Sequence, residues 1–285
     1  MKQWHDIMHK ALTEGVERPD RTGVGTMALF GEQLVFDNSV TFPAVTTKEL
    51  KFGQVKAELA AFIHGESTLE GFHKWGCRIW DGNAEQTAGS KFKPAFAGDL
   101  GRIYGVQWRN WHTYVGSSLP MAVDQLKELV HGLKANPYGR RHLVTAWNPG
   151  DLDDMVLPPC HVMFQCFVRP SPMGDDWPKV LDLRVDMRSV DLFLGLPFDI
   201  ASYALLQRLI AKEVGMDSGR LVFQLGDAHV YLNHGRQVGT VLGRKPFHPP
   251  SLAFADEASL FEFRPEHAEL FDYSHHPAVP APLNV

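Results

Sequence analysis

Residues 181–187 read Leu-Asp-Leu-Arg-Val-Asp-Met and carry the clearest secondary-structure pattern in the chain. Apolar and charged residues alternate strictly, which is the pattern of a β-strand with one face in a hydrophobic core. A short distance further on, residues 200–214 form a strongly apolar stretch that predicts a buried helix. This part of the chain therefore predicts a sheet and a helix that both contribute to a core.

Helices and strands are expected on both sides of this stretch, without strict alternation along the chain. Apolar residues at helical spacing predict helices over residues 2–14, around residues 55–64 and over residues 119–134. Such a mixture is typical of an α+β fold and most simply of one domain, residues 1–285. The remaining predictions are strands at 27–37, 142–147 and 161–168, a long surface loop from 81 to 101, and an irregular proline-rich tail from 276 to 285.

Composition excludes several classes of protein. With 285 residues and 44% hydrophobic residues, the chain can build a core without disulfide or metal support. A formal net charge of −5 argues against broad nucleic-acid binding, and no apolar run is long enough to span a membrane. Three cysteines do not form a disulfide framework, and no secretory signal pattern is visible at the start. These features favour a cytoplasmic protein.

One cysteine lies in a setting that suits a nucleophile. Cys160 follows two prolines and stands between two predicted strands, so its backbone is fixed in advance. A lone cysteine is more often a small buried hydrophobe, and Cys77 and Cys166 are interpreted in that way. No paired cysteines or histidines have metal-ligand spacing, so no metal site is expected.

Other polar residues are ambiguous when each is taken alone. Asp199 precedes the apolar helix and could be its N-cap. Arg140 and Arg141 could be a solvated charge pair. His229 and Tyr231 would share one face if the chain is extended there.

Taken together, these segments have a recognisable order. They include Asp20-Arg21-Thr22-Gly23, Thr46-Thr47-Lys48, Ile79-Trp80-Asp81, Gln107-Trp108-Arg109, Arg140-Arg141, Pro159-Cys160-His161, Arg188-Ser189, Phe193-Leu194-Gly195-Leu196-Pro197-Phe198 and Gly226-Asp227. Over nearly the whole chain, this order resembles the thymidylate synthase family. The resemblance implies a mixed, twisted sheet flanked by helices, and a homodimer that packs through the sheets.

The resemblance also implies roles for individual residues. Cys160 would add to C6 of a pyrimidine, with its thiol pKa lowered by Arg188, and Glu58 would be the general acid–base. Tyr104 and Asn148 would complete proton relays. The expected 5′-phosphate ligands are Arg21, Arg188 and Ser189, joined by Arg140 and Arg141 of the partner subunit, and the 3′-hydroxyl ligands are His229 and Tyr231. The co-substrate 5,10-methylenetetrahydrofolate would lie against Trp80, Asp191, Gly195 and Phe198. His161 has no role that the sequence reveals.

One departure from the family concerns the base. Where thymidylate synthases have asparagine after Leu-Pro-Phe, this chain has Asp199. A protonated carboxyl can donate to N3 of cytosine and accept from its 4-amino group, whereas O4 of uracil would face an acceptor. The same substitution marks the deoxycytidylate hydroxymethylases of the family, so dCMP is the expected substrate.

Other departures concern the product. Asn83 stands where a second tryptophan is usual, Glu49-Leu50-Lys51 replaces an Arg-x-His segment, and Leu225 replaces a small residue. A more hydrated folate wall would let water attack the transferred methylene, which gives 5-hydroxymethyl-dCMP and tetrahydrofolate. The alternatives are a dCMP methylase, a thymidylate synthase acting on dUMP, use of CMP, and a non-catalytic nucleotide-binding regulatory relative.

Overall fold

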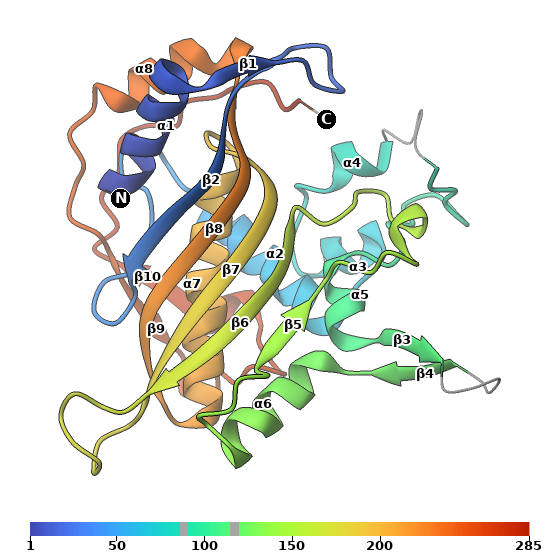
Figure 1. Cartoon of the computed structure of the whole chain (residues 1–285), viewed down its shortest axis with the longest axis vertical. Helices are drawn as coiled ribbons and strands as arrows, with labels where there is room; N and C mark the ends of the chain where they lie inside the picture. Colours follow the sequence, from blue (N-terminus) through green and yellow to red (C-terminus); the bar gives the residue numbers. More distant parts are fainter. Residues whose placement is uncertain (86–90, 115–119, 285) are drawn as a thin grey trace.

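A six-stranded mixed sheet forms the centre of the computed structural model, which describes residues 1–285 except 86–90, 115–119 and 285. The strand order is β1-β2-β8-β7-β6-β5, and neighbours are antiparallel except β7 and β8. Figure 1 shows the strands side by side in this order. The strands are β1 (Val16–Arg18), β2 (Thr26–Asp37), β5 (Leu143–Thr145), β6 (His161–Arg169), β7 (Val180–Asp191) and β8 (Asp217–Tyr231).

Helices cover one face of this sheet. The long helix α7 (Gly195–Val214) packs against β7 and β8, and α1 (Lys2–Glu14) packs against β2 and β8. Helix α2 (Phe52–His64) lies against α7, behind the sheet in the view of Figure 1. The described part of the chain also contains α3 (Leu69–Lys74), α4 (Asp81–Glu85), α5 (Tyr104–Arg109), α6 (Gln125–Ala135), α8 (Gly235–Leu242), and the hairpins β3 (Trp111–Tyr114) with β4 (Pro120–Val123) and β9 (Ser251–Phe254) with β10 (Ala268–Phe271).

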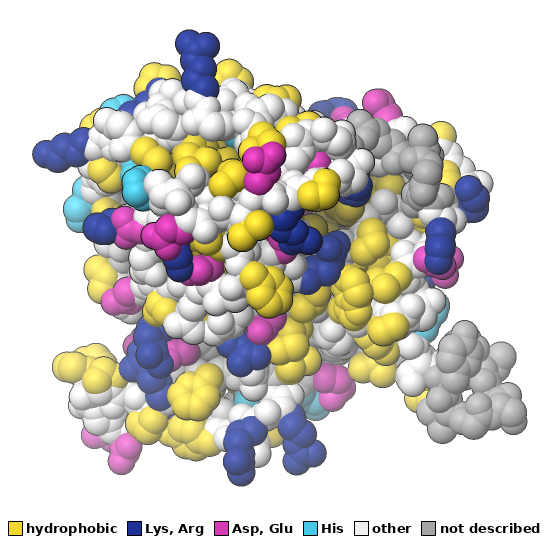
Figure 2. All heavy atoms as spheres, turned by 45° about the horizontal axis from the view of Figure 1, so that its top comes forward, with side chains coloured by type: hydrophobic (Ala, Val, Ile, Leu, Met, Phe, Trp, Pro, Cys, Tyr) yellow, Lys and Arg dark blue, Asp and Glu magenta, His cyan; other side chains and the backbone are white. Residues whose placement is uncertain are grey.

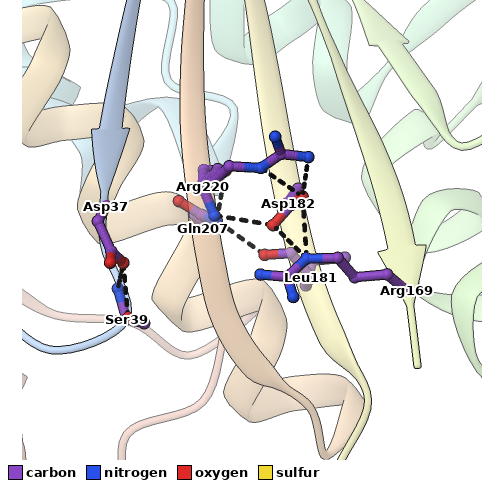
Figure 3. A network of polar contacts seen from close by, with 7 residues as sticks. All are labelled: Asp37, Ser39, Arg169, Leu181, Asp182, Gln207 and Arg220. Carbon is purple, nitrogen blue, oxygen red and sulfur yellow. Dashed lines mark hydrogen bonds and ion pairs between the residues drawn. The ribbon is translucent and has the colours of Figure 1, made fainter. Parts of the chain in front are cut away.

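The alternation in β7 separates the two faces of the sheet as predicted. Leu181, Leu183, Val185 and Met187 are all buried in the core beneath the helices. On the same strand Asp182 is also buried, although it is charged. Its carboxylate accepts hydrogen bonds from the guanidinium groups of Arg169 and Arg220, at 3.1 to 3.3 Å, and from the backbone N–H of Arg220 at 2.8 Å (Figure 3). Two arginines from the neighbouring strands thus offset the cost of burying this charge.

Gln207 joins α7 to the sheet through buried hydrogen bonds. Its side-chain amide donates to the carbonyls of Leu181 at 2.8 Å and Arg220 at 3.1 Å, and accepts from Asn38 at 3.1 Å. An amide buried without these partners would cost about 1–3 kcal/mol. The bonds therefore fix the position of α7 relative to β7 and β8.

The α+β fold and most of the predicted elements are confirmed. Elements at 2–14, 27–37, 55–64, 161–168 and 181–187 lie within or nearly coincide with α1, β2, α2, β6 and β7. The predicted strand at 142–147 is shorter, as β5. No regular element is assigned within residues 274–284, which agrees with the prediction for the tail; Val285 lies outside the described residues.

Three predictions need correction. The helix expected at 119–134 begins only at Gln125, because Asp124 caps it by accepting the backbone N–H of Lys127; residues 120–123 form β4, and residue 119 lies outside the described residues. The loop expected at 81–101 contains the short helix α4, and residues 86–90 lie outside the described residues. The apolar helix begins at Gly195 rather than residue 200, with Leu194 as its N-cap. Asp199 is therefore inside the helix and does not cap it.

Sequence patterns did not predict the long strand β8 or the hairpin β9–β10.

Among the described residues, no helix combines the length and apolar character needed to cross a membrane.

Candidate active site

Residues from distant parts of the chain meet around Cys160. The cysteine lies immediately before β6, and Arg188 lies on the neighbouring strand β7. Tyr104 is the first residue of α5, and its hydroxyl accepts the backbone N–H of Cys160 at 2.8 Å. The backbone N–H of Arg188 donates to the carbonyl of Cys160 at 2.8 Å. The strand pairing and the buried tyrosine thus hold the cysteine in place.

The Arg188 side chain fixes the loop that carries the cysteine. Its guanidinium group donates to the carbonyls of Pro158 at 2.9 Å and Pro159 at 2.8 Å. One guanidinium nitrogen also lies 4.0 Å from the sulfur of Cys160. The arginine is therefore placed both to position the thiol and to stabilise its thiolate.

The thiol pKa differs from the sequence-based prediction. Burial raises the pKa of Cys160, and this effect exceeds the lowering caused by Arg188; the nearby Asp199 raises it further. The lowered pKa expected from Arg188 alone is thus wrong for the free chain. The sequence identified the cation but not the depth at which the sulfur lies.

Glu58 is a carboxyl group whose protonation changes near neutral pH. Burial raises its pKa to about 7, while the indole N–H of Trp80, which donates to the carboxylate at 2.8 Å, acts in the opposite direction. A group with such a pKa can both accept and donate a proton at physiological pH.

Asp199 is biased towards its neutral form. Burial raises its pKa well above the ordinary value, and the negative charges of Glu58 and Asp191 raise it further. No arginine or lysine forms a salt bridge with it among the described residues; Nε2 of the His161 ring lies 3.8 Å from its Oδ1. A carboxyl in this setting keeps its proton more readily than an exposed aspartate does.

His161 and Tyr203 are the functional candidates that the sequence did not reveal. The ring of His161 stacks on Tyr104, with centroids 4.1 Å apart, and its Nδ1 lies 2.6 Å from the hydroxyl of Tyr203. Burial lowers the pKa of His161 to about 3, so its imidazole is neutral. The one sequence signal was its position beside Cys160.

His229 and Tyr231 lie together near the end of β8. Their ring centroids are 5.1 Å apart. Asp227 holds His229 through a hydrogen bond of 2.9 Å at Nδ1, and Arg18 pairs with the same carboxylate. This leaves Nε2 of His229 for another partner.

Asn148 belongs to a different polar network. Its amide nitrogen donates to Asp151 at 3.1 Å and lies 3.4 Å from the side-chain oxygen of Gln107, and its oxygen accepts the backbone N–H of Gly150. Among the described residues, these are its hydrogen bonds, and none connects it with Cys160. In the free chain, therefore, no direct contact supports the proton relay expected of Asn148.

Arg140 and Arg141 are exposed and lie far along the sheet from Cys160. The carbonyl of the next residue, His142, accepts the N–H of Cys166. At about 3.3 Å per residue, Cys166 is roughly 20 Å from Cys160 along the strand. The single chain thus does not bring these two arginines to the cysteine.

The comparison with protein families agrees with this arrangement. The family model described as thymidylate synthase matches residues 2–285. The chain belongs to the thymidylate synthase family. It is a one-carbon transferase that acts on a pyrimidine nucleotide with methylenetetrahydrofolate as co-substrate.

At the folate wall expected of this thymidylate synthase family member, Gly195 leaves room that a side chain would take up. A Cβ at Gly195 would lie 3.8 Å from both the Cβ of Asp191 and Oδ2 of Asp199, so glycine leaves this space free. The Asp191 carboxylate accepts the backbone N–H groups of Phe193 and Leu194, and Phe198 is partly buried. Trp80 is buried, and its indole N–H donates to Glu58. A planar ring system is compatible with an aromatic wall and a position without a side chain.

Two further observations bear on other kinds of site. A cavity of about 570 Å³ is lined by residues such as His64, Phe92 and Arg102, and by none of the predicted site residues. Within the described ranges, no group of three metal-ligating side chains occurs.

Arg188→Gln should slow alkylation of Cys160 by iodoacetamide about tenfold at neutral pH, because losing the cation raises the thiol pKa further. The rate is measured across pH and normalised to its plateau at high pH, so that altered access to the sulfur cancels. Cys77 and Cys166 are buried, and Cys160→Ala gives the background.

Arg184→Gln is the matched control, because Arg184 lies on the same strand and pairs with Asp186 instead. It should leave the alkylation profile unchanged. An unchanged midpoint in Arg188→Gln would show that Arg188 does not stabilise the thiolate.

Proposed function

We propose that the protein is a deoxycytidylate 5-hydroxymethylase, which converts dCMP and methylenetetrahydrofolate into 5-hydroxymethyl-dCMP and tetrahydrofolate. The observation that carries this proposal is the largely buried Asp199 carboxyl, whose side chain is 20% exposed and whose environment favours the neutral form. The family membership gives the coarser reaction, and Asp199 distinguishes the base.

A neutral Asp199 matches the hydrogen-bonding edge of cytosine. Its O–H can donate to N3, and its other oxygen can accept from the 4-amino group. Uracil presents an N3–H donor and an O4 acceptor, so the same carboxyl would leave at least one buried group unpaired. Such a mismatch costs about 1–3 kcal/mol, and polar sites often discriminate more strongly.

Cys160 would be the nucleophile. Addition of its sulfur to C6 of cytosine breaks the 5,6 double bond and makes C5 a carbon nucleophile. A proton from Asp199 to N3 makes C6 more electrophilic. Glu58, with a pKa of about 7, would exchange protons and orient water near the carbon that is transferred.

Because the pKa of the Cys160 thiol is raised, additional positive charge is needed to stabilise its thiolate when the substrate binds. Protonation of N3 by Asp199 removes the need for a negative charge on the ring as sulfur adds. Tyr104 can stabilise the same loop through its bond to the Cys160 backbone. Thiol activation is therefore proposed to occur in the complex rather than in the free chain.

Methylenetetrahydrofolate supplies the one-carbon unit when it is bound. Trp80, Asp191, Gly195 and Phe198 would hold it. Asn83 lies in α4, which directly follows Trp80 in the chain. We propose that Asn83 makes the folate wall more hydrated, which favours water as the final nucleophile.

A homodimer would complete the phosphate site. Arg21, Arg188 and Ser189 would bind the 5′-phosphate, together with Arg140 of the partner subunit and Arg141 of the partner subunit. Support comes from the exposure of Arg140 and Arg141 and their distance from Cys160 in one chain. Leu143 and Phe167, near them on β5 and β6, are also exposed and would be covered by sheet-to-sheet packing. His229 and Tyr231 would bind the 3′-hydroxyl.

Methylation of dUMP or dCMP is the second candidate, because the family description itself is that of a thymidylate synthase. These reactions differ from hydroxymethylation in the fate of folate. Methylation oxidises the tetrahydrofolate to dihydrofolate, whereas hydroxymethylation does not.

The deciding experiment incubates the purified protein with methylenetetrahydrofolate and dCMP, dUMP or CMP. Mass spectrometry should find 5-hydroxymethyl-dCMP, and absorbance should show no stoichiometric dihydrofolate. Methylated nucleotide with dihydrofolate would support methylation instead. No product and no exchange of tritium from C5 of dCMP would favour a non-catalytic nucleotide-binding protein.

Asp199→Asn should shift the preference from dCMP towards dUMP by at least tenfold in the ratio of kcat/KM values, because an amide can pair with N3–H and O4 of uracil. Cys160→Ala should bind either nucleotide but turn over neither. An unchanged ratio in Asp199→Asn would remove Asp199 as the residue that reads the base.

A further inference from the structure

His161 and Tyr203 form a buried pair directly behind Asp199, and the proposed reaction does not use them. Tyr203 lies one helical turn beyond Asp199 on α7, and His161 is the first residue of β6. The hydroxyl of Tyr203 is 2.6 Å from Nδ1 of His161, and Nε2 of the same ring is 3.8 Å from Oδ1 of Asp199. The three side chains thus form a chain that ends at the base-reading carboxyl.

The hydrogen bond between Tyr203 and His161 has one consistent direction. Burial raises the pKa of Tyr203 well above its ordinary value, so the phenol keeps its proton, and His161 is neutral with a single N–H. If Nδ1 carried that hydrogen, the phenol O–H would need another acceptor. Within the described part of the chain, the hydroxyl of Tyr203 makes no other hydrogen bond. The phenol therefore donates to Nδ1, and the imidazole proton lies on Nε2.

The ring of His161 has little freedom to turn away. One face stacks on Tyr104, and its edge meets Tyr203 at an interplanar angle of 87° with centroids 5.2 Å apart. Nε2 is consequently held on the side of Asp199. The distance of 3.8 Å is longer than a hydrogen bond, as is common in catalytic sites before the substrate binds.

We propose that Tyr203 is a positioning residue, which fixes the Nε2–H tautomer of His161 so that Oδ1 of Asp199 is the carbonyl oxygen and Oδ2 carries the proton. This inference rests on the proposed function. Oδ2 lies on the side of Gly195, which carries no side chain and whose Cβ position is 3.8 Å from it. Oδ1 has two lone pairs, one for the N–H of His161 and one for the 4-amino group of cytosine.

The other tautomer would have the opposite effect. A lone pair at Nε2 would attract the Asp199 proton to Oδ1 and remove it from the side that meets N3 of cytosine. The choice of tautomer therefore determines whether the carboxyl presents the donor and acceptor in the order that cytosine requires.

Nitrogen-15 NMR of the histidine side chains in the full-length protein tests the tautomer directly. The His161 resonances are assigned by their loss in His161→Gln. The wild-type protein should show a protonated Nε2 and an unprotonated Nδ1. Tyr203→Phe should give a mixture of tautomers or the Nδ1–H form, and should lower the preference for dCMP over dUMP about tenfold in the ratio of kcat/KM values.

Tyr273→Phe is the matched control, because it too removes a hydrogen-bonded hydroxyl, which bonds to Val45 and Leu50 and lies away from this chain of residues. It should change neither the tautomer nor the base preference. A protonated Nδ1 in the wild-type protein would overturn the proposal, and so would an unchanged base preference in Tyr203→Phe.

The NMR result also separates this inference from the proposed function. The predicted tautomer in a protein that does not turn over dCMP would refute the function while leaving the Tyr203–His161 arrangement intact. The wrong tautomer in a protein that hydroxymethylates dCMP would refute the positioning role alone.

Discussion

The desolvation of Glu58 and Asp199 is the constraint on which the site depends. Three carboxyl groups, Glu58, Asp191 and Asp199, lie near enough for their charges to affect one another, and Asp199 has no lysine or arginine in a salt bridge among the described residues. Ionising all of them in a poorly hydrated site would be costly. The protein avoids this cost by raising the pKa values of Glu58 and Asp199. Burial, rather than any single contact, therefore gives these groups protons to donate near neutral pH.

The fold creates this environment by combining buried helices with the ends of strands. Gln207 fixes α7 on the sheet, which places Asp199 beside the start of β6. Arg188 on β7 reaches across to the loop of Cys160. The same desolvation that favours a neutral Asp199 also raises the pKa of the Cys160 thiol. Desolvation of the site thus favours recognition of cytosine but makes the Cys160 thiol harder to ionise. Binding of the nucleotide must compensate for the second effect.

Sequence patterns predicted the parts of the fold that depend on local periodicity. The alternation at residues 181–187 and the helices at 2–14 and 55–64 were found because each buries one regular face. Strand β8 was missed although Leu221, Phe223 and Leu225 are buried in alternation, because the apolar Val222 between them hides the period of two and because β8 gains its partners from distant strands. The start of α7 was placed too late, since Gly195 and Pro197 are usually read as helix breakers, although proline is tolerated in a first turn.

Sequence motifs identified residues of the candidate site, but they did not reveal how burial changes the chemistry of those residues. Cys160, Arg188 and Asp199 could be chosen from the sequence, but the direction of the thiol pKa could not, because it depends on the competition between desolvation and Arg188. The contact of Tyr203 with His161 joins residues 42 positions apart, and no local pattern reveals it. Likewise, the sequence could not show that Asn148 bonds to Asp151.

The central claim is that Asp199 carries a proton at the pH at which the protein works. Infrared difference spectroscopy between the wild-type protein and Asp199→Asn at neutral pH measures this most directly. We expect the difference to contain the carbonyl band of a neutral carboxylic acid. A difference that contains only carboxylate bands would show that Asp199 is ionised, and would contradict the proposed recognition of cytosine.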